Sequence, residues 1–196
     1  VLQAYRVDRR LLPHPVASGT LVDRLTPGAA EATGLSSDTI AVTGAQDQKC
    51  AAYGAGLADG IATASLGTAT AIETLLERPL FDPALPIPCF PYLAPGLWVL
   101  EAAITTTGGA VTWLRDALRP VDPMVSHGGI SELAESAPPG SHGVVFLPFP
   151  AGAGTPHWRF GATGAFSGIT LAADIRDLAR AVLEGCCYEI ATALEA

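Results

Sequence analysis

Gly164-Ala165-Phe166-Ser167-Gly168-Ile169 and, seven residues later, Asp177-Leu178-Ala179-Arg180-Ala181-Val182-Leu183-Glu184 form the most informative stretch of this sequence. The second half begins a run in which apolar residues recur at intervals of four, the spacing that places side chains on one face of an α-helix. The recurring residues are Leu178, Val182, Cys186 and Ile190. Asp174, ahead of the run, is a typical N-cap residue. The stretch therefore predicts a long amphipathic helix that continues to the end of the sequence.

Short apolar runs upstream of this helix predict β-strands. β-branched and apolar residues cluster at 40–43, 61–64, 69–75, 97–104 and 144–147. Gly67 lies between the second and third of these runs, so we expect an antiparallel hairpin around it. Helical patterns occupy 29–33, 50–56 and 110–118. Together these segments predict an α/β fold in which helices flank a mixed sheet.

The segment 78–95 is rich in proline. Its six prolines are Pro79, Pro83, Pro86, Pro88, Pro91 and Pro95. Proline has no backbone N–H to donate and restricts its neighbours, which disfavours both helix and sheet. We therefore predict an extended surface loop without regular structure.

Composition limits the class of protein. Of 196 residues, 49% are apolar and 15% charged, yet no run approaches the roughly 18 apolar residues of a membrane span. Nineteen acidic residues outnumber 11 scattered basic residues, which argues against a nucleic-acid-binding surface. Four cysteines, at 50, 89, 186 and 187, lack C-x-x-C spacing and suit reduced, core-filling thiols. We expect a soluble, cytoplasmic protein that binds neither membrane nor nucleic acid.

Asp47 is the best single candidate for a reacting group. It follows the predicted strand 40–43, near the strand end at which α/β sheets bind ligands, and has polar neighbours in Gln46 and Gln48. A carboxylate there could act as a general base in phosphoryl transfer, which needs a base to orient a hydroxyl and donors to hold phosphates. It could equally cap the helix that follows. The residues alone leave both roles open.

Two glycine-containing turns could hold an anion. Ser65-Leu66-Gly67-Thr68 combines close backbone approach with a hydroxyl donor. Thr107-Gly108-Gly109 opens a predicted helix, where exposed amides and the helix dipole favour a phosphate. Each segment also suits an ordinary turn.

Other catalytic or metal-binding arrangements are disfavoured. The four histidines, His14, His127, His142 and His157, are far apart and beside Pro or Gly, so we expect no metal site. Ser126-His127 and Ser141-His142 are adjacent pairs whose side chains generally diverge, and no G-x-S-x-G elbow is present. Four further carboxylates at helical spacing are expected on solvated faces or as caps: Asp174, Asp177, Glu132 and Glu135.

Taken together, these segments resemble the FGGY family of carbohydrate kinases. The stretch quoted first matches the family's second signature at every position. Val42-Thr43-Gly44-Ala45-Gln46-Asp47-Gln48 resembles its catalytic stretch, and Ser65-Leu66-Gly67-Thr68 its second phosphate motif. Thr107-Gly108-Gly109 ahead of Trp113-Leu114-Arg115-Asp116 also matches. The resemblance covers essentially the whole chain and is greatest toward the xylulokinase-like branch.

This resemblance implies a ribonuclease H-like, actin-like fold whose two domains close over a sugar and ATP with Mg²⁺. Asp47 corresponds to the base that takes the proton from the attacking sugar hydroxyl, and Gln48 to a residue that touches the sugar. Four residues correspond to contacts with the nucleotide's phosphates: Gly67, Thr68, Gly108 and Gly109. The implied substrate is a pentulose or a similar small sugar, and no residue is implied as a metal ligand.

The resemblance also implies an internal stretch of such an enzyme. Residues 1–56 would end the N-terminal sugar-binding domain, and residues 57–196 would begin the C-terminal nucleotide-binding domain. The family's N-terminal Asp-x-Gly-Thr phosphate motif and its adenine-binding Gly-Gly segment fall outside this stretch. Alone, it should be inactive, expose the helix face that carries Val182, Cys186 and Ile190, and self-associate, for instance as a homodimer.

One segment departs from the family pattern. Many relatives carry Gly-Glu-Arg-Thr-Pro where this chain reads Gly152-Ala153-Gly154-Thr155-Pro156, so an ion-pairing Glu-Arg is lost. The departure favours an alternative function, a non-catalytic actin-like module that binds a nucleotide or a partner.

Overall fold

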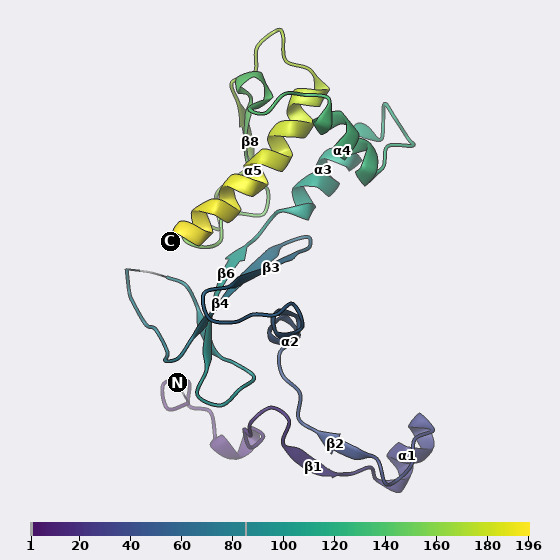
Figure 1. The fold of residues 1–196 in the computed structure, drawn as a ribbon, viewed down its shortest axis with the longest axis vertical. Helices are drawn as coiled ribbons and strands as arrows, with labels where there is room; N and C mark the ends of the chain where they lie inside the picture. The colour runs from purple at the N-terminus through teal and green to yellow at the C-terminus, as the bar shows by residue number, and fades with distance from the viewer. Residues whose placement is uncertain (1, 85) are drawn as a thin grey trace.

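The computed structural model describes residues 2–84 and 86–196, and it has the predicted mixture of helices and strands (Figure 1). The N-terminal part contains η1 (Arg9–Leu11), β1 (Leu21–Arg24), α1 (Pro27–Thr33) and β2 (Ile40–Val42). The middle contains α2 (Asp47–Gly54), β3 (Ala62–Leu66), β4 (Thr70–Leu76), β5 (Cys89–Pro91) and β6 (Trp98–Ile104). The C-terminal part contains α3 (Gly108–Leu118), α4 (His127–Glu135), η2 (Ser141–Gly143), β7 (Val145–Leu147), β8 (Ala165–Ser167) and α5 (Ile175–Glu195). The predicted α/β fold is confirmed.

The central sheet has the strand order β3-β4-β6-β5. The β3–β4 hairpin around Gly67 is antiparallel, as predicted. The pairs β4–β6 and β5–β6 are antiparallel too, as are the separate ribbons β1–β2 and β7–β8. The prediction of a mixed sheet is therefore wrong for residues 2–84 and 86–196, because every pair of named strands there is antiparallel. The strands of the central sheet follow one another through turns and loops, whereas a parallel pair would need a long crossover connection.

Strand β5 corrects the prediction that 78–95 lacks regular structure. Cys89, Phe90 and Pro91 pair with Leu100, Val99 and Trp98 of β6. Because β5 lies at the edge of the sheet, the missing N–H of Pro91 can face away from the ladder.

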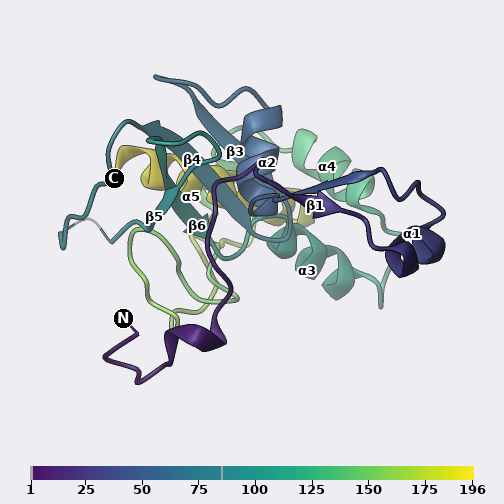
Figure 2. The same cartoon turned by 90° about the horizontal axis from the view of Figure 1, so that it is seen from below.

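The two faces of the central sheet are covered by different helices. Successive residues of a strand point to opposite faces. Leu75 and Val99 pack with Ala52 of α2, whereas Ile72 and Ala102 pack with Ala193 near the end of α5. Figure 2 shows α2 and α5 on either side of the strands.

The C-terminal part builds its own core from α3, α4, β7 and α5. Val182 is fully buried, Cys186 is buried, and Ile190 is half-buried against the sheet. The prediction that this face of α5 is exposed is therefore wrong. Phe146 of β7 and the helices α3 and α4, all within this chain, supply the surface that covers it.

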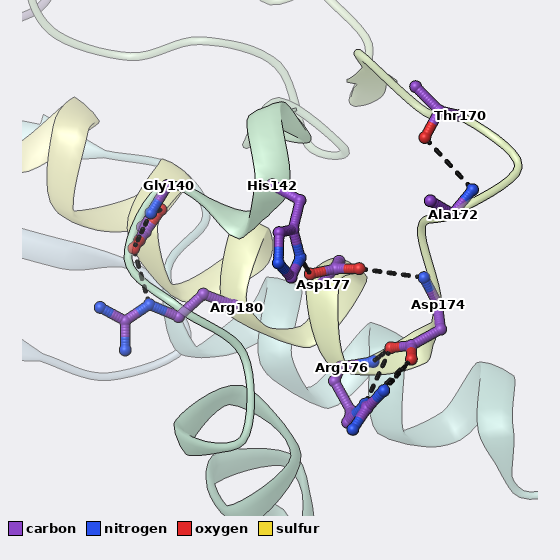
Figure 3. Close-up of polar contacts among 9 residues, drawn as sticks. Gly140, His142, Thr170, Ala172, Asp174, Arg176, Asp177 and Arg180 are labelled. Atoms are coloured by element: carbon purple, nitrogen blue, oxygen red, sulfur yellow. Dashed lines mark hydrogen bonds and ion pairs between the residues drawn. The ribbon is translucent and has the colours of Figure 1, made fainter.

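The start of α5 is fixed by a reciprocal cap (Figure 3). Asp174 accepts a hydrogen bond from the Arg176 amide, and the Asp174 amide donates to Asp177 at 3.0 Å. The second oxygen of Asp177 lies 2.8 Å from Nδ1 of His142, whose loop is thereby held against the helix. These contacts, the Asp174 amide first, lower the pKa of Asp177. The predicted capping role is confirmed, but Asp177 is buried rather than on a solvated face, unlike Glu132 and Glu135.

The N-terminal part extends away from the helical layer as an arm (Figure 1). Both strands of its ribbon carry exposed apolar side chains: Leu21, Val22, Ile40 and Val42. No helix in the described ranges is long and apolar enough to cross a membrane. The four cysteines are free thiols, but the prediction that they fill the core is wrong for Cys50 and Cys187, which are exposed; Cys186 is buried and Cys89 is half-buried.

Candidate active site

Asp47 is the first residue of α2, five residues beyond the end of β2. Its side chain is exposed, and Oδ1 accepts a hydrogen bond from the Gln48 amide at 2.8 Å. The positive end of the helix dipole favours a carboxylate at this place. Asp47 thus stabilises the helix start and remains accessible to a ligand, so the two roles left open by the sequence are compatible.

The two glycine turns, far apart in the sequence, are joined directly. The amides of Thr107, Gly108 and Gly109 donate to carbonyl oxygens of Gly67 and Thr68, each at 3.0 Å. The Thr107 hydroxyl adds a bond to the Gly67 carbonyl at 3.1 Å. The structure therefore brings the four predicted phosphate-contacting residues together at one end of the β3–β4 hairpin.

Glycine is required at this junction because the two backbones approach closely. A Cβ atom at Gly108 would lie 2.5 Å from the Gly67 carbonyl oxygen, and one at Gly109 would lie 3.1 Å from that of Thr68. The same bonds correct one detail of the sequence interpretation. The first amides of α3 are engaged by the hairpin and are not exposed donors, whereas Thr68 is exposed.

Helix α2 and the hairpin also share a cavity of about 180 Å³. Gln48 of α2 and Ser65 of β3 line it, together with alanines of α2 and Glu73 of β4. Gln48, predicted to touch the sugar, therefore lies against the hairpin that carries Gly67 and Thr68.

A buried ionic cluster beside this cavity was missed by sequence reasoning. Lys49, the only lysine of the chain, places Nζ 2.6 Å from Oε1 of Glu73 and also pairs with Glu101. The side chains of Lys49, Glu73 and Glu101 are 3%, 3% and 16% exposed. The Lys49 ammonium also lies 4.7 Å from the centre of the Phe90 ring on β5.

The glutamates of this cluster occupy facing positions on β4 and β6. Burial raises the pKa of Glu73, and the hydrogen bond from Lys49 opposes that shift. The sequence did offer a signal for this cluster. Glu73 and Glu101 are each the one charged residue of an otherwise apolar or neutral strand, and Lys49 is the one basic residue of α2.

The segment 152–156, which departs from the family pattern, is docked on β6. Thr155 donates its amide to the Ala103 carbonyl at 2.9 Å and accepts the Ala103 amide through its hydroxyl at 3.0 Å. A Cβ atom at Gly154 would collide with the Ala103 carbonyl oxygen. In this structure, the backbone of Gly154 and Thr155 contacts Ala103 closely, which leaves no room for a side chain at Gly154.

In the part of the chain that the structure describes, no group of three or more His, Cys, Asp or Glu residues could hold a metal ion. His142 pairs with Asp177, and His127 contacts Thr112 and Arg115 on the neighbouring helix.

Comparisons of sequence and of structure with known proteins both find carbohydrate kinases. The C-terminal domain model of the FGGY family of carbohydrate kinases matches residues 62–196. A xylulose kinase of Staphylococcus epidermidis is 30% identical over 181 residues, which are 92% of this chain and 36% of that enzyme. The structure of a ligand-bound xylulose kinase from Lactobacillus acidophilus superposes with a TM-score of 0.88 at 25% identity, over 99% of this chain and 39% of that one.

A glycerol kinase of Plasmodium falciparum, solved with ADP, has the same fold at 21% identity, with a TM-score of 0.78 over 98% of this chain and 38% of that one. The chain spans little more than a third of the length of these relatives. By its matching family model, the chain belongs to the FGGY family of carbohydrate kinases.

Proposed function

We propose that this chain forms part of an ATP-dependent carbohydrate kinase that transfers the γ-phosphoryl group of ATP to a sugar hydroxyl. The observation that carries the proposal is the junction of the two glycine turns beside the helix that begins at Asp47. The substrate class we propose is a pentulose or a similar small sugar, since xylulose kinases are among the relatives.

In this mechanism Asp47 accepts the proton of the sugar hydroxyl as its oxygen attacks the γ-phosphorus, and ADP leaves. Phosphoryl transfer requires little covalent work from the protein, so orientation of the hydroxyl and stabilisation of phosphate charge supply most of the rate. The exposed carboxylate of Asp47 suits the first task. Gln48, in the adjoining cavity, would hold the sugar.

The joined glycine turns would contact the phosphates of the nucleotide. Thr68 offers an exposed hydroxyl, and Gly67 lets the backbone approach. Gly108 and Gly109 would act through close packing of the turn and the dipole of α3, because their amides are already bonded. Mg²⁺ would enter with ATP as part of the substrate, which suits the lack of a three-ligand metal cluster among residues 2–84 and 86–196.

We further propose that residues 1–56 end the sugar-binding domain and that residues 57–196 begin the nucleotide-binding domain. The arm would then belong to the first domain, and α2 would lie at the boundary between the two. The free thiols suit work in the cytoplasm.

The test is the substitution Asp47→Asn in the full-length kinase that carries this chain. Asparagine keeps the shape of the side chain but cannot accept the proton, so kcat should fall by roughly 10² to 10⁴ while MgATP binding changes little. Coupled ADP release over a panel of pentuloses, hexuloses and polyols measures kcat, and calorimetry measures binding of the nucleotide.

Asp59→Asn, an exposed aspartate five residues beyond α2, is the matched control and should keep the normal rate. A normal kcat in Asp47→Asn would remove Asp47 from the mechanism. The alternative favoured by Gly152-Ala153-Gly154 is a non-catalytic nucleotide-binding module, and it predicts ATP binding without turnover by the unmodified protein on every sugar.

A further inference from the structure

We propose that Lys49, held between Glu73 and Glu101, is a positioning residue that fixes the helix carrying Asp47 against the sheet carrying the Gly67–Thr68 turn. The inference rests on the proposed kinase function. It concerns the relative placement of Asp47 and the phosphate turn. The resemblance to the kinase family gave Lys49 no role in that placement.

Helix α2 has little else to hold it. It has eight residues, and only Lys49 and Ala52 are buried. Ala52 contributes one methyl group to the contact with Val99 and Leu75 of the sheet. The hydrogen bonds of Lys49 to two strands, together with the contact of its ammonium with Phe90, are therefore the specific attachment of this helix.

The sheet in turn requires a cation at this position. Glu73 and Glu101 are directly opposite in the antiparallel register of β4 and β6, where like charges destabilise the pair. The Lys49 ammonium lies between them and turns this repulsion into attraction. Because breaking a buried ion pair leaves an uncompensated charge, loss of Lys49 would favour movement of α2 away from the two carboxyl groups.

The attachment point is close to the proposed chemistry on both sides. Lys49 is two residues beyond Asp47 in the same helix. Glu73 lies on β4, the strand that begins at Thr70 directly after the Gly67–Thr68 turn. The side chain of Glu73 lines the same cavity as Gln48 and Ser65. Oε2 of Glu73 has no hydrogen-bond partner among the described residues. A shift of α2 would thus change the placement of Asp47 and Gln48 relative to the phosphate turn together.

The experiment compares Lys49→Met, Glu101→Gln and the control Arg180→Met in the full-length protein. Arg180 forms an ion pair with Glu184 within α5, so its loss removes a charge pair, more exposed than that of Lys49, without touching the proposed site. Kinetics are measured at a temperature at which circular dichroism shows each variant to be folded. A misplacement of about 1 Å can cost 10²-fold in rate. We expect kcat to fall by about 10- to 100-fold in Lys49→Met and by less in Glu101→Gln. In both variants, KM for MgATP should stay within about twofold of the normal value. Arg180→Met should keep the normal kcat.

A second readout does not depend on activity. An amine-reactive reagent should modify Lys49 slowly in the unaltered protein and at least about tenfold faster in Glu101→Gln, as peptide mass spectrometry can measure at this residue. If folded Lys49→Met and Glu101→Gln keep the normal kcat, Lys49 has no positioning role. If Lys49 is labelled as fast in the unaltered protein as in Glu101→Gln, the attachment itself is refuted. If the unaltered protein phosphorylates no sugar but Lys49 is protected, the kinase proposal fails while the attachment of α2 stands.

Discussion

At the scale of single residues, the junction of the two turns depends on the absence of a side chain at Gly108. We predict that Gly108→Ala destabilises the chain by about 1–3 kcal/mol, because the added methyl group meets the Gly67 carbonyl oxygen at 2.5 Å and the backbones must separate. The midpoint of urea unfolding, followed by far-ultraviolet circular dichroism, measures the change.

Gly54→Ala is the matched control for this prediction. Gly54 is the last residue of α2, and a Cβ atom there meets nothing within 4 Å. Alanine loses less backbone entropy than glycine, so the control should be neutral or stabilising by up to about 1 kcal/mol. Equal effects of the two substitutions would show that close approach does not explain Gly108.

The residues of the site differ in how far the sequence could predict them. Asp47 and the glycine turns have local signals, since each follows a strand or begins a helix, and the structure joins the two turns. Lys49, Glu73 and Glu101 stand out in the sequence only as single charges within their segments, and their contact joins three elements separated by up to 52 residues. Their pairing follows only from the strand register, which a single sequence does not reveal.

At the scale of elements, α5 begins with a charged cap whose strength depends on pH. Hydrogen bonds from the Arg176 side chain and then its amide lower the pKa of Asp174 from 3.8 to about 2. A carboxyl group whose pKa is lower in the folded state stabilises that state above its unfolded pKa. This contribution is complete above pH 3.8 and is lost as pH falls toward 2.

We therefore predict that Asp174→Asn lowers the urea midpoint at pH 5 and that the difference from the unaltered chain shrinks between pH 4 and pH 2. Asparagine is itself a good N-cap, so the substitution isolates the charge. Measurements of both chains at pH 5, 4, 3 and 2 supply the test. A difference that stays constant over this range would mean that the Asp174 carboxylate contributes nothing through its ionisation.

The elements also show why some patterns predict better than others. Helix α5 has 21 residues and repeated apolar spacing, and it was predicted together with its Asp174 cap. Strand β5 has three residues within a proline-rich segment, so local propensity argued against it. Its pairing with β6 is a tertiary effect, and it supplies the Phe90 ring beside Lys49.

At the scale of the whole molecule, the arm and the C-terminal part are stabilised very differently. The helices α3, α4 and α5 and strand β7 share a buried core, whereas β1 and β2 form a two-stranded ribbon with exposed apolar side chains. Isolated two-stranded ribbons are marginal in water. The exposed apolar surface of the chain therefore lies on the arm, at Leu21, Val22, Ile40 and Val42, and not on the face of α5 that carries Val182 and Cys186.

This uneven support leads to a prediction about the 196-residue chain by itself. Asp47 is exposed at the boundary between the arm and the sheet, and the chain spans 36% of the xylulose kinase of Staphylococcus epidermidis. Catalysis by positioning requires that sugar, base and MgATP be held together, a contribution that can reach roughly 7–11 kcal/mol. We expect the purified chain to release no sugar-dependent ADP from MgATP with pentuloses, hexuloses or polyols, while the full-length kinase does so under the same conditions. Turnover by the chain alone in the usual range of about 1–10³ per second would show that these residues complete the active site without further segments.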